Sequence, residues 1–459
     1  GDTVRHILKA SGAKALITVP GLKDMLNEHL VAASGEDTQL IVNDSLEGEP
    51  MERAYPPCDV GLDDLAFLQF TSGSTRKPKG VMVTHRNLSH NAHNIMFDGL
   101  RSTAQDRGVT WLPLFHDMGL IGFVIAPLFA QVQVMFLPTM NFIRRPGTWL
   151  DAVDRFRGTI TFAPNFAYAL ATRSVPAGQS YKWDLSCLKA LGCGAEPIQP
   201  EVLDRFLARF EKNGLKANAV LPCYGLAEAT LAVTFIGLDE TLKIDRVCPE
   251  NLKRGRAAAA NGHGAVDLVS CGKPFPGHRL RVVDEADSDL PERQIGHILL
   301  EGPSATAGYF RQPDATAEVF TQDGWLRTGD LGYLADGELY VCGRAKDLII
   351  INGKNYYPQD IERSASECHN VRQDQCGAFS HQGEAGEECV VVCEATKAGT
   401  DPDALARAVR QRVRSDLGIH VADVVIIKRN SMPKTSSGKV RRRETKLRYE
   451  ASTLELFTQ

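Results

Sequence analysis

Short runs of apolar and β-branched residues recur along the first half of the chain, and segments with a helical pattern separate them. The runs are LAFLQF, GVMVTH, VQVMFL, GTITFAP, KALGCG and KANAVLPCYG. Strands that alternate with helices and are apolar on both faces are typical of largely parallel, buried sheets. The sequence therefore predicts an α/β fold for this part of the chain.

The pattern changes after about residue 270, where the strand-like segments HRLRVVD, GHILLEG and GELYVCGR follow one another closely and predict a β-rich subdomain. Further along, DPDALARAVRQRVRSDLG places apolar residues four apart, from Leu405 to Leu417, and Gly418 follows as a helix C-cap. Strand-like CVVVCEA precedes this helix and VVIIK follows it. These features predict a small α+β domain at the C-terminus.

A chain of 459 residues exceeds what one hydrophobic core usually serves, so we expect more than one packed unit. The domain boundary is expected in GRAKDLIIING, where a charged turn joins two strand-like segments. We therefore expect an N-terminal domain over 1–345, which includes the β-rich subdomain at about 270–345, and a mobile C-terminal domain over 346–459.

Composition excludes several classes of function. The chain has 52 Lys plus Arg and 56 Asp plus Glu, and this net charge of -4 argues against binding of nucleic acid. The eleven cysteines form no CxxC pair, which argues against a zinc site and structural disulfides. We expect no signal peptide, because GDTVRHILKASGAK lacks a charged start followed by a continuous apolar stretch. We expect a cytoplasmic protein.

The apolar stretch 118–137 is long enough to cross a bilayer. Pro127 at its middle, Gln131 and Gln133 at alternating positions, and the lack of a basic flank argue against that interpretation. We expect a buried helix followed by a buried strand, and no membrane-spanning segment.

The segment TSGSTRKPKG, at 71–80, lies between two strand-like runs. Glycine lets the backbone approach a polyphosphate, hydroxyls and amides donate to its oxygens, and lysine supplies charge. A Ser/Gly run alone is usually a flexible linker, but the flanking strands favour a phosphate loop, although the Walker pattern is absent. The candidate phosphate ligands are Thr71, Ser72, Gly73, Ser74, Thr75 and Lys79.

This segment resembles the phosphate-binding loop of the adenylate-forming superfamily, which contains acyl-CoA synthetases, luciferases and peptide-synthetase adenylation domains. Six further motifs follow in that superfamily's order. They are LPLFHDMG (112–119), GAEP (194–197), YGLAEAT (224–230), RTGD (327–330), GRAKDLIIINGKNYYPQDIE (343–362) and PKTSSGK (433–439). The resemblance implies the acetyl-CoA synthetase-like fold, in which a large α/β and β-rich part carries a small mobile α+β domain.

The resemblance also implies roles for individual residues. Lys439 is expected to be the catalytic lysine that bridges the substrate carboxylate and the α-phosphate, arriving on a mobile loop. His116 either orients the carboxylate or only caps and packs a helix, and the resemblance favours the first. Lys346 is expected at the hinge. The acyl pocket is expected to include Met118, Gly119 and Ile121.

The nucleotide site is expected to involve three further motifs. Tyr224 offers a ring that could stack on adenine, and Asp330 offers a carboxylate for the ribose hydroxyls. Glu228 and Thr71 are the expected ligands of Mg²⁺ that accompanies ATP. Without the resemblance, a packed ring, a turn-forming Asp and a solvated Glu remain the ordinary alternatives. The remaining expected nucleotide contacts are Gly194, Ala195, Glu196, Gly225 and Arg344.

Within the superfamily, LPLFHDMGLIG, PNFAYAL, YGLAEATLAV and IIINGKNYYPQDIE are most similar to fatty acyl-AMP ligases. Residues 231–270 are also longer than a CoA-forming relative would need. The resemblance implies that ATP and a fatty acid form acyl-AMP and pyrophosphate. The acyl group would pass to the phosphopantetheine of an acyl carrier protein, in polyketide, nonribosomal peptide or lipid biosynthesis.

Two alternatives remain open: a medium- or long-chain acyl-CoA synthetase, and a nucleotide-binding protein without catalysis. Intact Lys439, Glu228 and Asp330 count against the second. Within 231–270, Ile244 and Val247 are expected to anchor the segment on the large domain, although it could be an ordinary surface loop. Family members carry additional residues before VRHILKASGAKALIT, so we expect an incomplete N-terminal subdomain and reduced activity.

Overall fold

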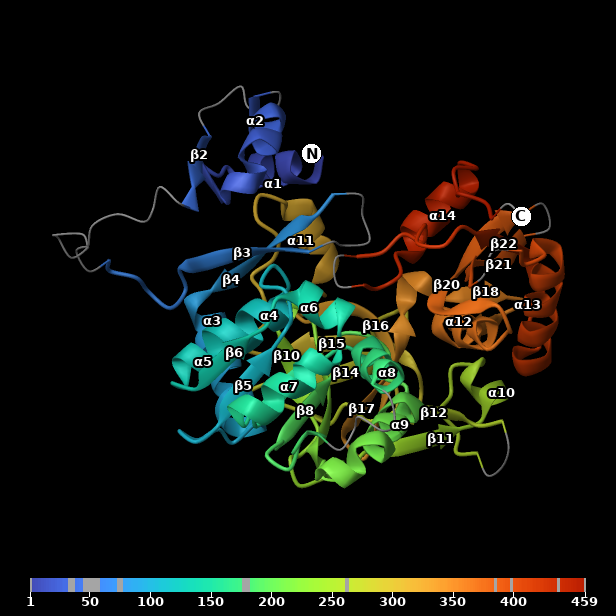
Figure 1. The fold of residues 1–459 in the computed structure, drawn as a ribbon, viewed down its shortest axis with the longest axis horizontal. Helices are drawn as coiled ribbons and strands as arrows, with labels where there is room; N and C mark the ends of the chain where they lie inside the picture. The colour runs from blue at the N-terminus through green and yellow to red at the C-terminus, as the bar shows by residue number, and fades with distance from the viewer. Residues whose placement is uncertain are drawn as a thin grey trace.

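A large domain and a small domain lie side by side in the computed structural model (Figure 1). The residues that it describes are 2–31, 38–43, 58–71, 77–175, 182–260, 264–383, 386–396, 399–435 and 438–457. A seven-stranded sheet forms the centre of the large domain. Its spatial order is β13 (Lys273–Pro274), β10 (Ala232–Phe235), β9 (Val220–Gly225), β8 (Ala190–Cys193), β7 (Ile160–Ala163), β5 (Arg107–Thr110) and β6 (Gln133–Phe136).

The sheet is parallel from β6 through β9, whereas β10 and β13 add an antiparallel edge. Strands β7 and β8 are buried at every residue, because β-branched and small side chains face packed layers on both sides. The α/β prediction is therefore confirmed. Each of the six strand-like runs contains a strand.

Three helices pack together over this sheet: α7 (Gly147–Phe156), α8 (Asn165–Ser174) and α9 (Pro200–Phe210). Trp149, Tyr168 and Phe206, one from each helix, are at most 1% exposed. The ring of Tyr168 lies with its centroid 5.6 Å from Trp149 and 5.2 Å from Phe206. Removing such a buried ring typically costs about 3–5 kcal/mol, so this cluster fixes α8 against the sheet.

The apolar stretch 118–137 forms a broken helix and then a strand. The helix comprises α4 (Asp117–Leu120), a π-helical turn at Ile121–Ile125 and α5 (Ala126–Phe129). Over the described ranges, no helix is both long and apolar enough to cross a membrane. The expectation of a buried strand is wrong for β6, because β6 is the edge of the sheet and Phe136 is 49% exposed.

The β-rich subdomain is a four-stranded antiparallel sheet. Its strands are β14 (Arg279–Val283), β15 (Gly296–Glu301), β16 (Leu326–Ala335) and β17 (Glu338–Arg344). A separate hairpin, β3 (Leu65–Thr71) and β4 (Lys79–Thr84), flanks the segment proposed as the phosphate loop. The strands expected on both sides of that segment are therefore present.

The N-terminal segment forms a small unit of its own. It contains α1 (Asp2–Ser11), β1 (Ala15–Thr18), α2 (Lys23–Val31) and β2 (Gln39–Val42), and the two strands pair in parallel. His6 Nε2 lies 2.9 Å from the carbonyl oxygen of Pro78, which joins this unit to the β3–β4 hairpin.

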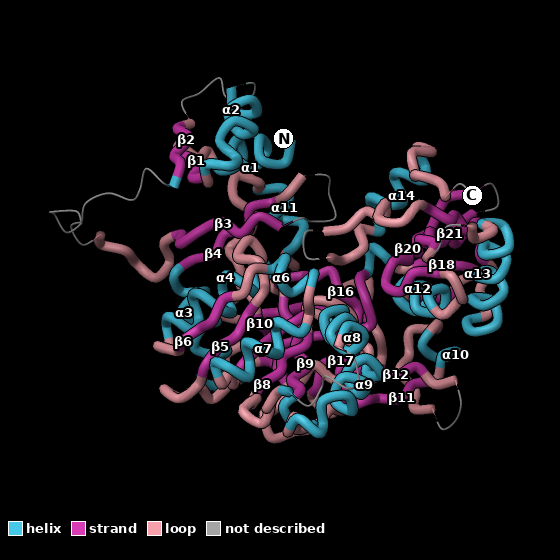
Figure 2. Tube along the Cα trace, viewed as in Figure 1, coloured by secondary structure: helices cyan, strands magenta, loops and turns pink. Residues whose placement is uncertain are grey.

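The small domain has a three-stranded sheet in the order β20 (Val371–Gly383), β21 (Gly386–Ala395) and β22 (Val421–Ile427). Helix α13 (Pro402–Leu417) connects the parallel strands β21 and β22, and Gly418 ends it at φ 66°, as predicted. Figure 2 shows α13 and α12 (Pro358–Ser366) beside this sheet. The remaining elements are β18 (Ile349–Ile351), β19 (Lys354–Tyr356) and α14 (Arg442–Glu450).

Residues 231–270 contain β11 (Ile244–Val247), α10 (Pro249–Leu252) and β12 (Val266–Val269) beyond strand β10. Val247 is fully buried in a cluster with large-domain side chains, whereas Ile244 is 38% exposed. The expected apolar anchor is therefore right for Val247 and wrong for Ile244: successive residues of a strand face opposite sides, so two residues three apart do as well.

The same segment also contacts the small domain. The backbone carbonyl of Lys253 accepts a hydrogen bond from Asn355 N at 2.9 Å. Lys253 Nζ donates to the carbonyl of Leu417, the last residue of α13, also at 2.9 Å. The segment between β11 and β12 thus connects the two domains.

Candidate functional site

Lys439 of the small domain reaches into the large domain, where its Nζ donates to the carbonyl oxygen of Ala195. Its loop is held by two hydrogen bonds with Thr435: Lys439 N donates to Thr435 Oγ1 at 3.0 Å, and Thr435 N donates to the Lys439 carbonyl at 2.8 Å. Burial lowers the pKa of Lys439, while the charges of Glu196 and Asp117 oppose that shift. The folded chain therefore brings the GAEP, FHDMG and PKTSSGK motifs to one place.

The GAEP motif follows the buried strand β8. A Cβ on Gly194 would lie 2.6 Å from Cys223 Sγ, so only glycine fits beside β9 here. Ala195 has a left-handed backbone, with φ 67°, and its carbonyl meets Lys439. Glu196 Oε1 accepts a hydrogen bond from Phe166 N, in the first turn of α8, at 2.7 Å. Burial raises the pKa of Glu196.

His116 is the N-cap residue of α4, so the capping interpretation describes its position in this structure. Its Nδ1 lies 2.6 Å from Asp117 Oδ1 and 3.3 Å from Met118 N. The shorter contact requires a proton on Nδ1, which then donates to Asp117. Burial alone would raise the pKa of Asp117, but the hydrogen bond and charge of His116 and the charge of Lys439 leave it lowered.

The expected adenine and ribose residues contact each other directly. Tyr224 is 8% exposed at the end of β9, and its hydroxyl donates to Asp330 Oδ2 at 2.8 Å. Asp330 is 7% exposed, and its Oδ1 lies 3.4 Å from Arg344 Nε. The pairing of Asp330 with Arg344 across β16 and β17 explains this contact. Burial raises the pKa of Asp330, and the charge of Arg344 opposes that shift.

Gly225 follows Tyr224 where strand β10 comes close. A Cβ there would lie 1.9 Å from the carbonyl oxygen of Leu231, so this close approach of the two chain segments requires glycine. Stacking on adenine, hydrogen bonding to ribose and the nucleotide contacts of Gly194, Ala195, Glu196 and Gly225 remain predictions.

Glu228 lies in a short helical turn at Ala227–Ala229, and its Oε1 accepts a hydrogen bond from the hydroxyl of Tyr309 at 2.8 Å. Lys79 Nζ lies 4.6 Å from the centroid of the same tyrosine ring. Thr71 pairs with Lys79 at the end of the β3–β4 hairpin. These contacts bring the start of the predicted phosphate loop, its lysine and the predicted metal ligand together around Tyr309. Ser72, Gly73, Ser74 and Thr75 lie outside the described residues.

The predicted acyl-pocket residues are all buried. Met118 is 7% exposed and Ile121 is fully buried. A Cβ on Gly119 would lie 2.2 Å from the carbonyl oxygen of Pro113, so close packing of the helix requires this glycine. Packing explains all three positions, and their contact with an acyl chain remains a prediction.

Lys346 lies in the short turn Ala345–Asp347 that follows β17 and precedes the small domain. The next residue, Asp347, accepts from Arg442 Nη1 at 3.2 Å. Arg442 also pairs with Glu362, with its Nε 2.6 Å from Glu362 Oε1. These contacts tie the exit of the turn to α12 and α14, so Asp347 belongs structurally to the small domain.

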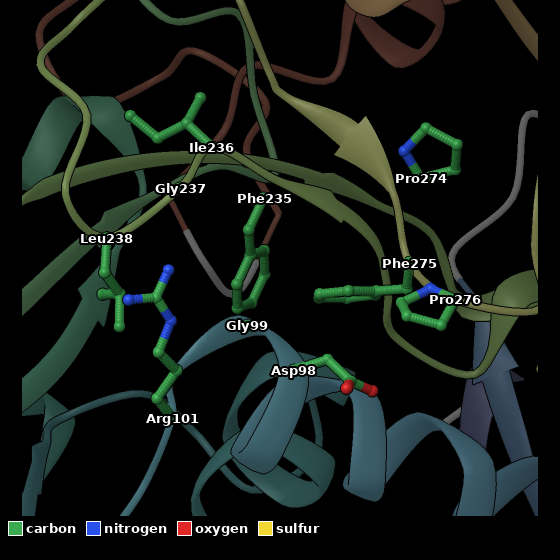
Figure 3. A pocket seen from close by; sticks show the side chains of 10 residues that line it. All are labelled: Asp98, Gly99, Arg101, Phe235, Ile236, Gly237, Leu238, Pro274, Phe275 and Pro276. Atoms are coloured by element: carbon green, nitrogen blue, oxygen red, sulfur yellow. The ribbon is translucent and has the colours of Figure 1, made fainter.

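A pocket elsewhere in the large domain lies between the π-helical turn at Asn94–Gly99 and strands β10 and β13 (Figure 3). Phe235 and Phe275 form its apolar wall, and Asp98 and Arg101 are among its lining residues. None of the predicted site residues line it.

Two residues of the site were not singled out from the sequence. Asp117 was contained in the FHDMG motif, which was the available signal, and the fold brings it within the electrostatic influence of Lys439. Tyr309 lies outside every motif quoted above, and only the fold brings it to Glu228 and Lys79. Its position depends on an isolated bridge between Val81 and Tyr309, far apart in sequence.

Comparisons with known proteins agree with these motifs. The profile of the family described as AMP-binding enzyme matches residues 1–310, and a profile described as the AMP domain of Disco-interacting protein 2-like proteins matches 346–459. A Caulobacter vibrioides protein, named provisionally as an acyl-CoA synthetase, is 38% identical over 98% of this chain and 79% of its own length. The medium-chain-fatty-acid–[acyl-carrier-protein] ligase JamA of Moorena producens is 34% identical, over 98% and 78%.

A solved chain from a study of fatty acyl-adenylate ligases from E. coli and L. pneumophila is similar with a TM-score of 0.90. It is 35% identical, and the match covers 98% of this chain and 81% of that one. The sequence profile, the full-length relatives and the fold agree. The chain belongs to the AMP-binding family of adenylate-forming ligases and, within that family, is similar to the fatty acyl-AMP ligases.

Proposed function

We propose that this chain activates a fatty acid with ATP, forming acyl-AMP and releasing pyrophosphate, and passes the acyl group to the phosphopantetheine of a carrier protein. The observation that carries the proposal is the contact of Lys439 with Ala195 across the two domains. A lysine held there lies within the electrostatic influence of Asp117 and Glu196, which belong to two other motifs of the set. The similarity to fatty acyl-adenylate ligases supports the class of substrate.

In the proposed reaction, a carboxylate oxygen attacks the α-phosphorus of ATP, and the bond from that phosphorus to the bridging oxygen of pyrophosphate breaks. Negative charge gathers between the two reactants, and the Lys439 ammonium would stabilise it in the transition state. The carboxylate is already ionised at neutral pH, so no general base is needed. The protein's main contributions are orientation and charge.

Glu228 suits a divalent cation bound with ATP, because Mg²⁺ usually takes one or two protein carboxylates and completes its shell with phosphates and water. Its carboxylate accepts one hydrogen bond from Tyr309, which leaves its second oxygen for a ligand. Over the part of the chain that the structure describes, no three His, Cys, Asp or Glu side chains form a metal cluster. The cation would neutralise phosphate charge, and Thr71 is the second proposed ligand.

The proposed acceptor is a carrier protein, as the name of the JamA relative states for that protein. The contacts of Lys253 with Asn355 and Leu417 identify the segment between β11 and β12 as the part of the chain that would restrict the small domain's rotation into a CoA-using arrangement. A small domain that must rotate between half-reactions would have to break them first. The Caulobacter relative's name favours the second candidate, an acyl-CoA synthetase.

The decisive experiment supplies the protein with ATP, Mg²⁺ and fatty acids of increasing length. Acid-dependent exchange of pyrophosphate into ATP is the expected result and measures adenylation. Its absence with every fatty acid would overturn the proposal.

A second arm adds either CoA or a phosphopantetheinylated carrier protein. We expect acyl-carrier and little acyl-CoA; efficient formation of acyl-CoA would establish the second candidate. A matched variant that lacks residues 246–264 tests whether this segment prevents the use of CoA. If the variant forms acyl-CoA and the intact protein does not, the segment is what excludes CoA as an acceptor.

A further inference from the structure

An arginine on the large domain binds two side chains of the small domain. Arg173 lies in the last turn of α8, and its Nη1 donates to Gln373 Oε1 at 2.6 Å. Its Nη2 donates to Asp374 Oδ2 at 3.1 Å. Both partners belong to β20, so these contacts exist only in a domain arrangement that brings β20 to α8.

The backbone of β20 is irregular at this point. Its pairing with β21 shifts register between Val371 and Cys376, as in a β-bulge. Asp374, inside the shift, has φ 58°, a left-handed conformation that Asp tolerates better than most residues. The bulge takes Gln373 and Asp374 out of the regular ladder, and both meet Arg173.

The bulge is also connected to the loop that carries Lys439. Arg372 Nη1 lies 2.8 Å from Glu394 Oε2, and Glu394 is fully buried. The other oxygen of Glu394 accepts from Met432 N at 2.8 Å, just before PKTSSGK. A buried carboxylate bound on both sides holds these segments in a fixed geometry. The bulge and the loop that carries Lys439 are therefore held in a fixed position relative to each other through Glu394.

A second cross-domain ion pair lies on the same side of the large domain. Arg363 of α12 has its Nη1 3.6 Å from Glu201 Oε1 in the first turn of α9. Helices α8 and α9 both face the small domain (Figure 1). In the Arg363 pair the cation is on the small domain and the carboxylate on the large domain, the reverse of the Arg173 contact; Arg173 has the shorter contacts and two partners.

We infer that Arg173 and the β20 bulge form a latch that holds the small domain where Lys439 contacts Ala195. Arg173, Gln373 and Asp374 are positioning residues for adenylation, and they touch no reacting atom. The inference rests on the proposed function, because the latch acts on adenylate formation and must open before acyl transfer.

The test is a charge reversal and its repair. Arg173→Glu places its carboxylate opposite that of Asp374 and should lower the population of molecules in which Lys439 contacts Ala195. Pyrophosphate exchange should then fall on the order of fivefold, the size expected for an interaction between exposed charges. Adding Asp374→Lys restores opposite charges and should recover most of the exchange. Transfer from preformed acyl-AMP to the carrier should stay unchanged or rise in the single variant.

Arg157→Glu is the matched control, because Arg157 pairs with Asp184 at 3.0 Å within the large domain and is 43% exposed, compared with 44% for Arg173. The latch is wrong if Arg173→Glu behaves like Arg157→Glu, if the double variant shows no recovery, or if exchange and transfer fall equally. Wild-type protein without any exchange would instead contradict the proposed function. Asp374→Asn keeps the left-handed preference and should give a smaller loss than Arg173→Glu.

Discussion

The two domains supply their site residues in opposite ways. In the large domain, Tyr224 and Asp330 are nearly buried, lie on strands and bind each other at 2.8 Å. In the small domain, Lys439 is half-exposed on a loop after Gly438, whose φ is 89°. The large-domain pair is thus fixed by its own packing, whereas the position of Lys439 depends on how the domains meet.

This difference predicts a division of labour. Groups held by strand pairing and burial keep their geometry without a ligand and suit the recognition of a substrate. A charged group on a loop between domains can enter for one step and leave for the next. Substitutions in the two regions should therefore change different kinetic quantities.

Replacing Lys439 with Ala should have the largest effect, because it removes the positive charge that we assign to the space between the substrate carboxylate and the α-phosphate. We expect adenylation to fall about 10²–10³-fold, as for the loss of one transition-state donor. Pyrophosphate exchange measures this, and transfer from preformed acyl-AMP should remain largely intact. Lys446→Ala, at a half-exposed lysine on α14, is the control; an equal loss in both half-reactions would contradict the assignment.

Replacing Asp330 with Ala should chiefly weaken ATP binding. The change removes hydrogen bonds that we expect to exist in the ground and transition states alike, so the KM for ATP should rise about tenfold with a smaller change in kcat. Asp330→Asn, which keeps the contact with Tyr224, should show an intermediate value. An unchanged KM for ATP in both variants would rule out the ribose role.

Replacing Lys346 with Pro should restrict rotation at the turn between the domains, because proline fixes φ. Adenylation can proceed in the arrangement seen here, so we expect transfer to slow about threefold or more relative to adenylation. Single-turnover measurements of each half-reaction give the ratio. Lys346→Ala removes the side chain alone and should leave the ratio unchanged; a uniform effect of Pro would argue against a hinge.

The smallest effect is expected at Asp360, in the first turn of α12, where burial raises the pKa from 3.8 to about 6. Because this pKa is higher in the folded state, ionisation destabilises the fold; the penalty is absent below pH 3.8 and complete above about pH 6. The side chain remains 22% exposed, so we expect Asp360→Asn to stabilise the protein by about 1 kcal/mol at pH 8. Thermal unfolding should show this gain at pH 8 and none at pH 3.5.

The sequence pattern predicted the structure correctly wherever neighbouring residues in the sequence decide the local structure. The spacing of Leu405 to Leu417 and the glycine after it predicted α13 and its end, which the structure confirms. The alternation of runs predicted the buried strands β7 and β8. The pattern gave the wrong prediction at β6, because an apolar strand at the edge of a sheet has the same sequence pattern as one at its centre. Only the order of the strands in the sheet distinguishes the two.

The sequence by itself determined the family, the order of the motifs and the residue types available for chemistry, because these depend on local composition and spacing. Only the tertiary structure decided which residues meet: Lys439 with Ala195, Tyr309 with Glu228, and Arg173 with the β20 bulge. Such contacts join segments 81 to 244 positions apart, and nothing in the local sequence specifies a partner at that distance. They follow from how the sheets and domains pack, where burial and backbone pairing leave one arrangement for each side chain.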